Sequence, residues 1–168
     1  MTYITIFNKK YDINLQYLSF YCHDLNSLPA SIGNLINLQQ LDLSCNPLSS
    51  LPRAIGNLHK LQKLEVTDNQ LSSLPRVIWN LINLQELNLS NNELSCLPTT
   101  ISNLINLKKL NLSDNQLSSL PATIGNLINL QYLDLSSIRY SYLPHFNLTR
   151  NQLNSLPEAI GNLINLKK

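Results

Sequence analysis

The apolar residues of this chain recur in a pattern that returns every 23 positions. The clearest copy runs from Leu84 to Asn106 and has the form LxxLxLxxNxLxxLPxxIxxLxx. A repeat of this length predicts a solenoid, in which each copy forms one coil and buries its apolar side chains against the next coil. The other copies start at Leu15, Leu38, Leu61, Leu107 and, with an interruption, Leu130.

The LxxLxL part of each copy alternates apolar and polar residues, which is typical of a half-buried strand. In the clearest copy, Leu87 and Leu89 should point inward, while Glu86 and Asn88 point outward. Strands of successive coils then stack in parallel, about 4.8 Å apart, so equivalent residues form columns on one face. The rest of each copy is too short for a long helix and predicts a 3₁₀ or single-turn helix.

An asparagine follows the strand in most copies, where the backbone turns away from the sheet and leaves its polar groups without strand partners. A short amide side chain can satisfy these groups, so we interpret the asparagines as structural. The proline of each LPxxI segment fixes φ and lacks a donor, which suits the turn onto the other side of the coil. The predicted asparagine ladder consists of Asn46, Asn69, Asn92, Asn115 and Asn151.

With this spacing, the chain resembles the leucine-rich repeat family from Leu15 to Lys168. The stretch LPATIGNLINLQYLDLS, from Leu120 to Ser136, is similar to the class found in intracellular Ras-pathway scaffolds, plant Ras-group-related repeat proteins and many bacterial and large-virus proteins. The resemblance implies an α/β horseshoe solenoid with a concave parallel sheet and short 3₁₀ or helical segments on the convex side. It also implies protein binding in signalling or host interaction. Two residues depart from the pattern, because His23 replaces the first asparagine and Trp79 replaces a glycine.

The chain divides into a terminal segment and one repeat domain. Residues 1–14 break the pattern, and TYITIF alternates as a short strand against the first coil would, so we expect a capping segment there. Residues 15–168 form the repeat domain of about six repeats, with an irregular insertion at 136–148. The insertion is a functional loop, a degenerate repeat or a gene-model error. Either the strand-like stretch after Leu130 or the one after Leu143 joins the sheet.

The outward-facing strand positions form the expected binding surface. They mix acids, lysines and amides, with tyrosines at both ends, and such a face suits a protein or peptide partner. For any single position, a merely solvated sheet face is the alternative. The residues expected to contact the partner are Tyr17, Gln40, Asp42, Lys63, Glu65, Glu86, Asn88, Lys109, Asn111, Tyr132 and Asp134.

A second candidate surface lies on the convex side. Basic residues from adjacent coils gather there with one tryptophan, and this patch would suit an acidic partner. Its residues are Arg53, His59, Lys60, Arg76 and Trp79.

Composition argues against several classes of function. The formal net charge is +2 with 13% charged residues and no basic tract, so neither nucleic acid nor a membrane is an expected partner. No apolar run approaches the roughly 18 residues that span a bilayer, and the first residues lack the order of a signal peptide. The motifs GxSxG, CxxC and HExxH and glycine-rich phosphate loops are absent, so we expect no enzyme, metal or cofactor.

The three cysteines are an odd count without flanking clusters, which favours a reducing, cytoplasmic location. Cys22 and Cys45 occupy the same position one repeat apart, so their Cα atoms could lie within disulfide range. We nevertheless expect free thiols, because stacked parallel Cβ vectors do not aim at each other.

Two functional hypotheses remain. The leading one is a non-enzymatic protein-interaction module that holds its partner on the concave sheet. The second is a structural role, in which the C-terminal coil at Leu163–Lys168, expected to lack a cap, docks to another copy of the chain.

Overall fold

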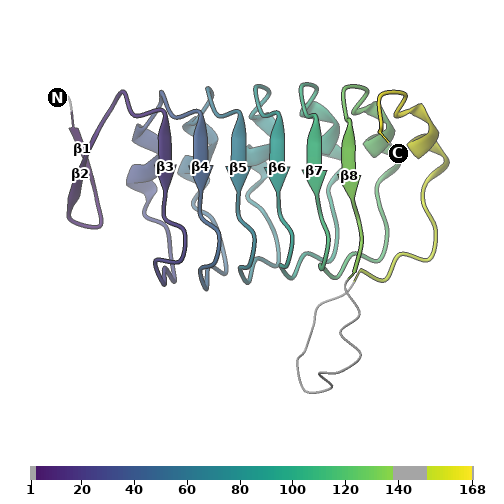
Figure 1. The fold of residues 1–168 in the computed structure, drawn as a ribbon, viewed down its shortest axis with the longest axis horizontal. Coiled ribbons are helices and arrows are strands. Elements are labelled where there is room, and N and C mark those ends of the chain that lie inside the picture. Colours follow the sequence, from purple (N-terminus) through teal and green to yellow (C-terminus); the bar gives the residue numbers. More distant parts are fainter. Residues whose placement is uncertain (1–2, 138–150, 168) are drawn as a thin grey trace, which may run out of the picture.

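The computed structural model describes residues 3–137 and 151–167. Strands line one side of this part of the chain, and 3₁₀ helices lie behind them (Figure 1). The strands form a six-stranded parallel sheet in sequence order, which confirms the predicted solenoid. The six strands are β3 (Tyr17–Ser19), β4 (Gln40–Asp42), β5 (Lys63–Glu65), β6 (Glu86–Asn88), β7 (Lys109–Asn111) and β8 (Tyr132–Asp134).

The register of the sheet follows the 23-residue period. Tyr17 pairs with Gln40, Gln40 pairs with Lys63, and the same step continues to Tyr132 on β8. The stretch after Leu130 is therefore the one that joins the sheet. The stretch after Leu143 and residues 138–148 of the expected insertion lie outside the described residues.

The short helical segments behind the sheet each begin directly after the proline of an LP pair. That proline has an extended backbone, for example φ −71° and ψ 150° at Pro29. Each segment is a single 3₁₀ element, as expected from the few residues available before the next strand. The segments are η1 (Ala30–Asn34), η2 (Arg53–Asn57), η3 (Arg76–Asn80), η4 (Thr99–Asn103), η5 (Ala122–Asn126) and η6 (Glu158–Asn162).

The core lies between the sheet and the 3₁₀ helices and consists almost wholly of leucine and isoleucine. In the coil that contains β5, for example, Leu61, Leu64 and Ile78 are fully buried. Because these are the apolar positions of the repeat, each coil contributes one layer to a continuous core.

The first residues form a hairpin of β1 (Tyr3–Ile6) and β2 (Lys9–Asp12), which is separate from the main sheet. Ile6 is buried in the core. The rings of Phe7 and Tyr11 pack edge-to-face against the ring of Phe20, with centroid distances of 5.5 and 6.0 Å. The hairpin thus covers apolar surface of the first coil.

Buried asparagines connect successive coils. Asn46 accepts hydrogen bonds from the backbone N–H groups of His23 and Leu25, at 3.1 and 2.9 Å. It donates to the carbonyl oxygen of Phe20 at 2.9 Å and to that of Leu43 at 2.8 Å. Equivalent bonds are made by Asn69, Asn92, Asn115 and Asn151.

Cys22 and Cys45 form a disulfide across the first two coils, with their Cα atoms 4.7 Å apart. The expectation of free thiols at these positions is therefore wrong. It treated the two side chains as members of a strand column, but both residues lie in the turn after the strand with φ of 52° and 60°. The side-chain directions of a strand column therefore do not apply to them.

Glycines allow the 3₁₀ helices to pack closely. A Cβ atom on Gly56 would lie 2.6 Å from Cβ of Val77 in the next coil, which is too close for two carbon atoms. Trp79 occupies the equivalent position in η3 and is buried at 2% exposure. Between η3 and η4 the surface opens into a cleft of about 380 Å³.

Candidate partner-binding surface

The outward side chains of β3 to β8 form one continuous surface, which we call the sheet face. The parallel register places them in two columns, and all eleven residues expected to contact a partner lie there. The first column is Tyr17, Gln40, Lys63, Glu86, Lys109 and Tyr132, and the second is Ser19, Asp42, Glu65, Asn88, Asn111 and Asp134.

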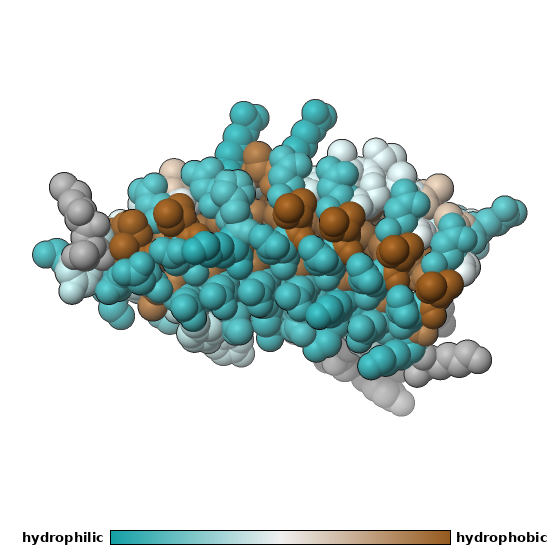
Figure 2. Space-filling model, turned by 90° about the horizontal axis from the view of Figure 1, so that it is seen from above, coloured by the Kyte–Doolittle hydropathy of each residue, from teal (hydrophilic) through white to brown (hydrophobic). Residues whose placement is uncertain are grey.

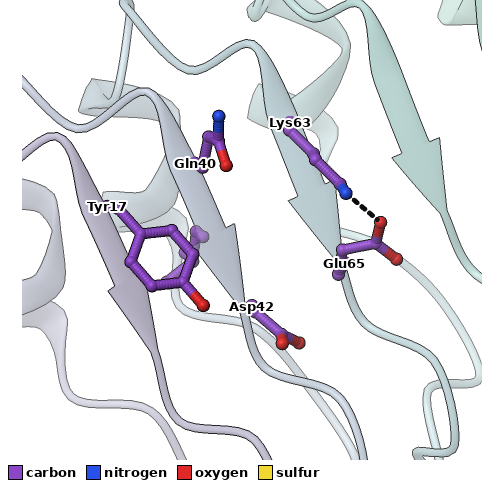
Figure 3. A pocket seen from close by; sticks show the side chains of 6 residues that line it. Tyr17, Gln40, Asp42, Lys63 and Glu65 are labelled. Carbon is purple, nitrogen blue, oxygen red and sulfur yellow. Dashed lines mark ion pairs between the residues drawn. The ribbon is translucent and has the colours of Figure 1, made fainter.

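A shallow pocket of about 90 Å³ lies on β3, β4 and β5 (Figure 3). The ring of Tyr17, the carboxylate of Asp42 and the Lys63–Glu65 pair border it, together with Gln40. Tyr17 is 57% exposed, so its ring stands beside the pocket and is available for contact.

A second pocket of about 120 Å³ lies further along the sheet face. Glu65, Glu86, Lys109 and Tyr132 contribute its charged and aromatic groups. Glu65 therefore borders both pockets, and the two form one path across β3 to β8.

Ion pairs connect the lysines of the sheet face to its glutamates. The Nζ atom of Lys63 lies 3.0 Å from Glu65 and 3.8 Å from Glu86, and Nζ of Lys109 lies 2.7 Å from Glu86. The hydrogen bond to Glu65 raises the pKa of Lys63, against a smaller opposing effect of desolvation. Both lysines are thus held by acids of the same face.

Tyr132 and Asp134 form a polar pair at the β8 end. The hydroxyl of Tyr132 donates to Asp134 at 3.0 Å, and this bond raises the pKa of Tyr132. Burial acts to raise the pKa of Asp134, but hydrogen bonds from Ser136 and Tyr132 outweigh it and lower that pKa. Asp134 is therefore ionised at neutral pH.

Several second-column residues also shape the turns that follow the strands. Oδ1 of Asn88 accepts hydrogen bonds from the backbone N–H and the hydroxyl of Ser90, and Asn111 does the same with Ser113. Asp42 accepts a bond from the backbone N–H of Ser44 in the same way, at 2.9 Å. Such local bonds stabilise the turn. At Asn88 and Asn111 they leave mainly the amide nitrogen for a partner.

Sequence reasoning missed an apolar ridge along the edge of the solenoid where the strands begin. Figure 2 shows it as a row of apolar side chains bordered by hydrophilic ones. The signal was present in the repeated LIN triplet, in which an exposed isoleucine directly follows a buried leucine. The ridge consists of Ile36, Ile82, Ile105, Ile128 and Ile164, which are 51–82% exposed.

A second amide ladder runs beside this ridge. Nδ2 of Asn106 donates to the carbonyl oxygen of Ile82 in the preceding coil at 2.8 Å, and Asn129 does the same to Ile105. In one coil Lys60 replaces the asparagine of this ladder, and its Nζ donates a hydrogen bond to Oδ1 of Asn37 at 2.7 Å. The ridge is thus supported by bonds between coils.

The convex patch differs from its expectation. Trp79 is 2% exposed, so it packs in the core and offers no surface to a partner. Arg53 and Arg76 are exposed on adjacent 3₁₀ helices, and Arg76 borders the cleft between η3 and η4. The basic residues remain at the surface, but the aromatic member of the patch does not.

Sequence comparisons identify the repeat. A family model described as "leucine-rich repeat region" matches residues 11–99, and one described as "leucine rich repeat" matches residues 83–137. The chain belongs to the leucine-rich repeat family. No curated protein sequence matches this leucine-rich repeat chain.

Solved structures of other leucine-rich repeat proteins share the fold. A leucine-rich repeat protein of Leptospira interrogans is 36% identical, with a TM-score of 0.56, over 86% of this chain and 45% of its own. The ectodomain of the plant receptor kinase GASSHO1/SCHENGEN3 from Arabidopsis thaliana, in complex with CASPARIAN STRIP INTEGRITY FACTOR 2, is 34% identical. Its TM-score is 0.75, over 92% of this chain and 18% of the ectodomain. The leucine-rich repeat domain of the type III effector XopL is 29% identical, with a TM-score of 0.74, over 92% of this chain and 60% of that domain.

The leucine-rich repeat chain thus spans less than half of the Leptospira protein and a smaller share of the plant ectodomain. Within residues 3–137 and 151–167, no helix has the length and apolar character needed to cross a membrane. The same residues contain no group of three or more His, Cys, Asp or Glu side chains that could hold a metal ion.

Proposed function

We propose that this protein is a non-enzymatic binding module that holds a protein or peptide partner on its sheet face. Leucine-rich repeat domains generally mediate protein–protein interaction, and the plant ectodomain similar to this chain is found in complex with CASPARIAN STRIP INTEGRITY FACTOR 2. What carries the proposal is the row of in-register polar and charged side chains, with half-exposed tyrosines at both ends.

The sheet face supports this function better than the back of the molecule does. It offers two adjoining pockets, exposed aromatic rings and charged groups held in fixed positions by ion pairs. Aromatic side chains with fixed polar neighbours are typical of the residues that dominate binding energy at protein interfaces.

The compartment in which binding occurs bears on the choice of partner. A disulfide between Cys22 and Cys45 favours an oxidising environment, because cytosolic thiols are kept reduced. This observation argues against the cytoplasmic location expected from the cysteine count. Extracts prepared without reductant are therefore the appropriate source of a partner.

Affinity capture tests the proposal. The bait is compared with a double variant, Tyr17→Ala with Tyr132→Ala, which removes the two exposed rings of the sheet face without changing charge. The matched control is Tyr3→Ala with Ile164→Ala, which removes two apolar side chains, 59% and 82% exposed, away from that face. We expect a protein that the wild type and the control retain and the sheet-face variant loses.

Two other outcomes would contradict the proposal. A protein retained equally by all three baits would place the partner elsewhere on the molecule. Capture of the chain's own untagged copies, with concentration-dependent oligomers in solution, would favour the self-assembly hypothesis instead.

A further inference from the structure

The two pockets of the sheet face share the same set of charged and aromatic groups. The first contains the carboxylates of Asp42 and Glu65, the ammonium group of Lys63 and the ring of Tyr17. The second repeats this set with Glu65, Glu86, Lys109 and Tyr132. Each pocket therefore combines two carboxylates, one ammonium group and one tyrosine.

The lysines of the sheet face do not neutralise all of its carboxylates. Lys63 lies within ion-pair distance of two glutamates, and Lys109 pairs with Glu86. Across β3 to β8, four carboxylates face two lysines, although the whole chain carries a formal net charge of +2. The positive charge of the chain thus lies elsewhere, and the sheet face has a negative balance. The four carboxylates are Asp42, Glu65, Glu86 and Asp134.

Exposed tyrosine rings next to carboxylates suit a cationic side chain. A lysine or arginine that enters such a pocket gains charge-assisted hydrogen bonds to the carboxylates and a cation–π contact with the ring. Tyr17 and Tyr132 are 57% and 48% exposed, so both rings are accessible to an incoming side chain.

We propose that the partner presents an extended basic segment, whose lysine or arginine side chains occupy the two pockets. This inference rests on the proposed function and specifies the chemistry of the partner. The pockets are centred about two and a half strands apart, which corresponds to roughly 12 Å. An extended chain advances about 3.3 Å per residue and alternates its side chains between two sides. Cationic residues four positions apart therefore lie about 13 Å apart on the same side of the segment, which matches this separation.

Fluorescence anisotropy with labelled synthetic probes tests this proposal. The probes are twelve-residue serine–glycine peptides with lysine, glutamine or glutamate at every fourth position, so they differ only in charge. The wild type should bind the lysine probe at least about tenfold more tightly than the glutamine probe, which corresponds to 1.4 kcal/mol. The glutamate probe should not bind.

Two matched double variants separate pocket binding from general attraction between opposite charges. Asp42→Asn with Glu65→Gln removes two carboxylates from the pockets while keeping the size of both side chains. Glu93→Gln with Glu158→Gln makes the same change in net charge at exposed residues outside the sheet face. The pocket variant should weaken the lysine probe by about tenfold, and the control by less than about twofold.

Equal weakening by the two double variants would overturn the inference, as would equal binding of the lysine and glutamine probes. Failure of this inference is distinguishable from failure of the proposed function. A partner captured through Tyr17 and Tyr132, without pocket-dependent binding of the lysine probe, would retain the function and reject the basic segment. A capture that does not depend on the tyrosines would remove the basis of both.

Discussion

At the scale of single residues, the asparagine ladder joins each coil to the preceding one. Asn92 accepts a hydrogen bond from the backbone N–H of Leu71 and donates to the carbonyl oxygens of Val66 and Leu89. Asn92 is 1% exposed, so water cannot replace these bonds. Its side chain therefore satisfies polar groups of two coils at once.

Replacing Asn92 with alanine should lower the free energy of unfolding by about 3 kcal/mol or more, because several buried backbone groups lose their partner. Urea denaturation followed by circular dichroism measures the change. The control is Asn103→Ala, at an exposed residue of η4, which should change stability by less than about 0.5 kcal/mol. Similar losses in both variants would contradict the structural role of Asn92.

The disulfide between Cys22 and Cys45 gives a second prediction at this scale. Thiol titration of the native, unreduced protein should detect only Cys96, which is exposed and unpaired. Reduction should lower stability by about 3 kcal/mol, because the cross-link no longer restricts the unfolded chain. Cys96→Ser should show the same loss on reduction. Three reactive thiols in unreduced protein would contradict the pairing.

At the scale of elements, two glycines of the same IGNL motif give a matched comparison. A Cβ atom on Gly125 of η5 would collide with the carbonyl oxygen of Ala159, whereas a Cβ on Gly161 of η6 meets no atom within 4 Å. Gly125→Ala should therefore destabilise the fold by about 1–3 kcal/mol through overpacking. Gly161→Ala should be neutral or slightly stabilising. Thermal melts of the two variants distinguish them, and equal melting temperatures would contradict the close packing of η5 and η6.

The apolar ridge should contribute little to stability. Ile105 is 55% exposed, so Ile105→Thr should change the free energy of unfolding by less than about 0.5 kcal/mol. The adjacent Leu104 is fully buried, and Leu104→Ala should lower it by about 2–5 kcal/mol. Chemical denaturation measures both values. A large loss at Ile105 would show that the ridge packs against other residues.

The strands, their register and the columns of the sheet face follow from the sequence. The alternation of apolar and polar residues within a strand decides which side chains point outward, and the 23-residue repeat decides which of them are neighbours on adjacent strands. The pattern does not reveal backbone conformation in the turns. The prediction of free thiols was therefore wrong for Cys22 and Cys45, which have positive φ and form a disulfide. The pattern also assigned no role to Ile105, since an apolar residue between buried leucines looks like part of the core. Trp79 was expected at the surface because small residues, Gly56 and Ser102, hold that position in the neighbouring coils.

At the scale of the whole molecule, charge is distributed unevenly. The sheet face has an excess of carboxylates, whereas Arg53 and Arg76 lie on the opposite side, at the start of η2 and η3. Composition alone could not show this separation, because the numbers of acidic and basic residues in the whole chain are nearly equal. The fold thus produces a negatively charged sheet face on a chain with a small positive net charge.

Site-specific photo-cross-linking is the most direct test of the claim that the partner lies on the sheet face. A photoreactive amino acid is introduced at Gln40 on β4 or, in a separate variant, at Ala122 on η5. Both residues are exposed, and they lie on opposite sides of the solenoid. The captured partner should cross-link from Gln40 and not from Ala122. Cross-linking from Ala122 with none from Gln40 would place the partner on the back of the molecule and contradict this account.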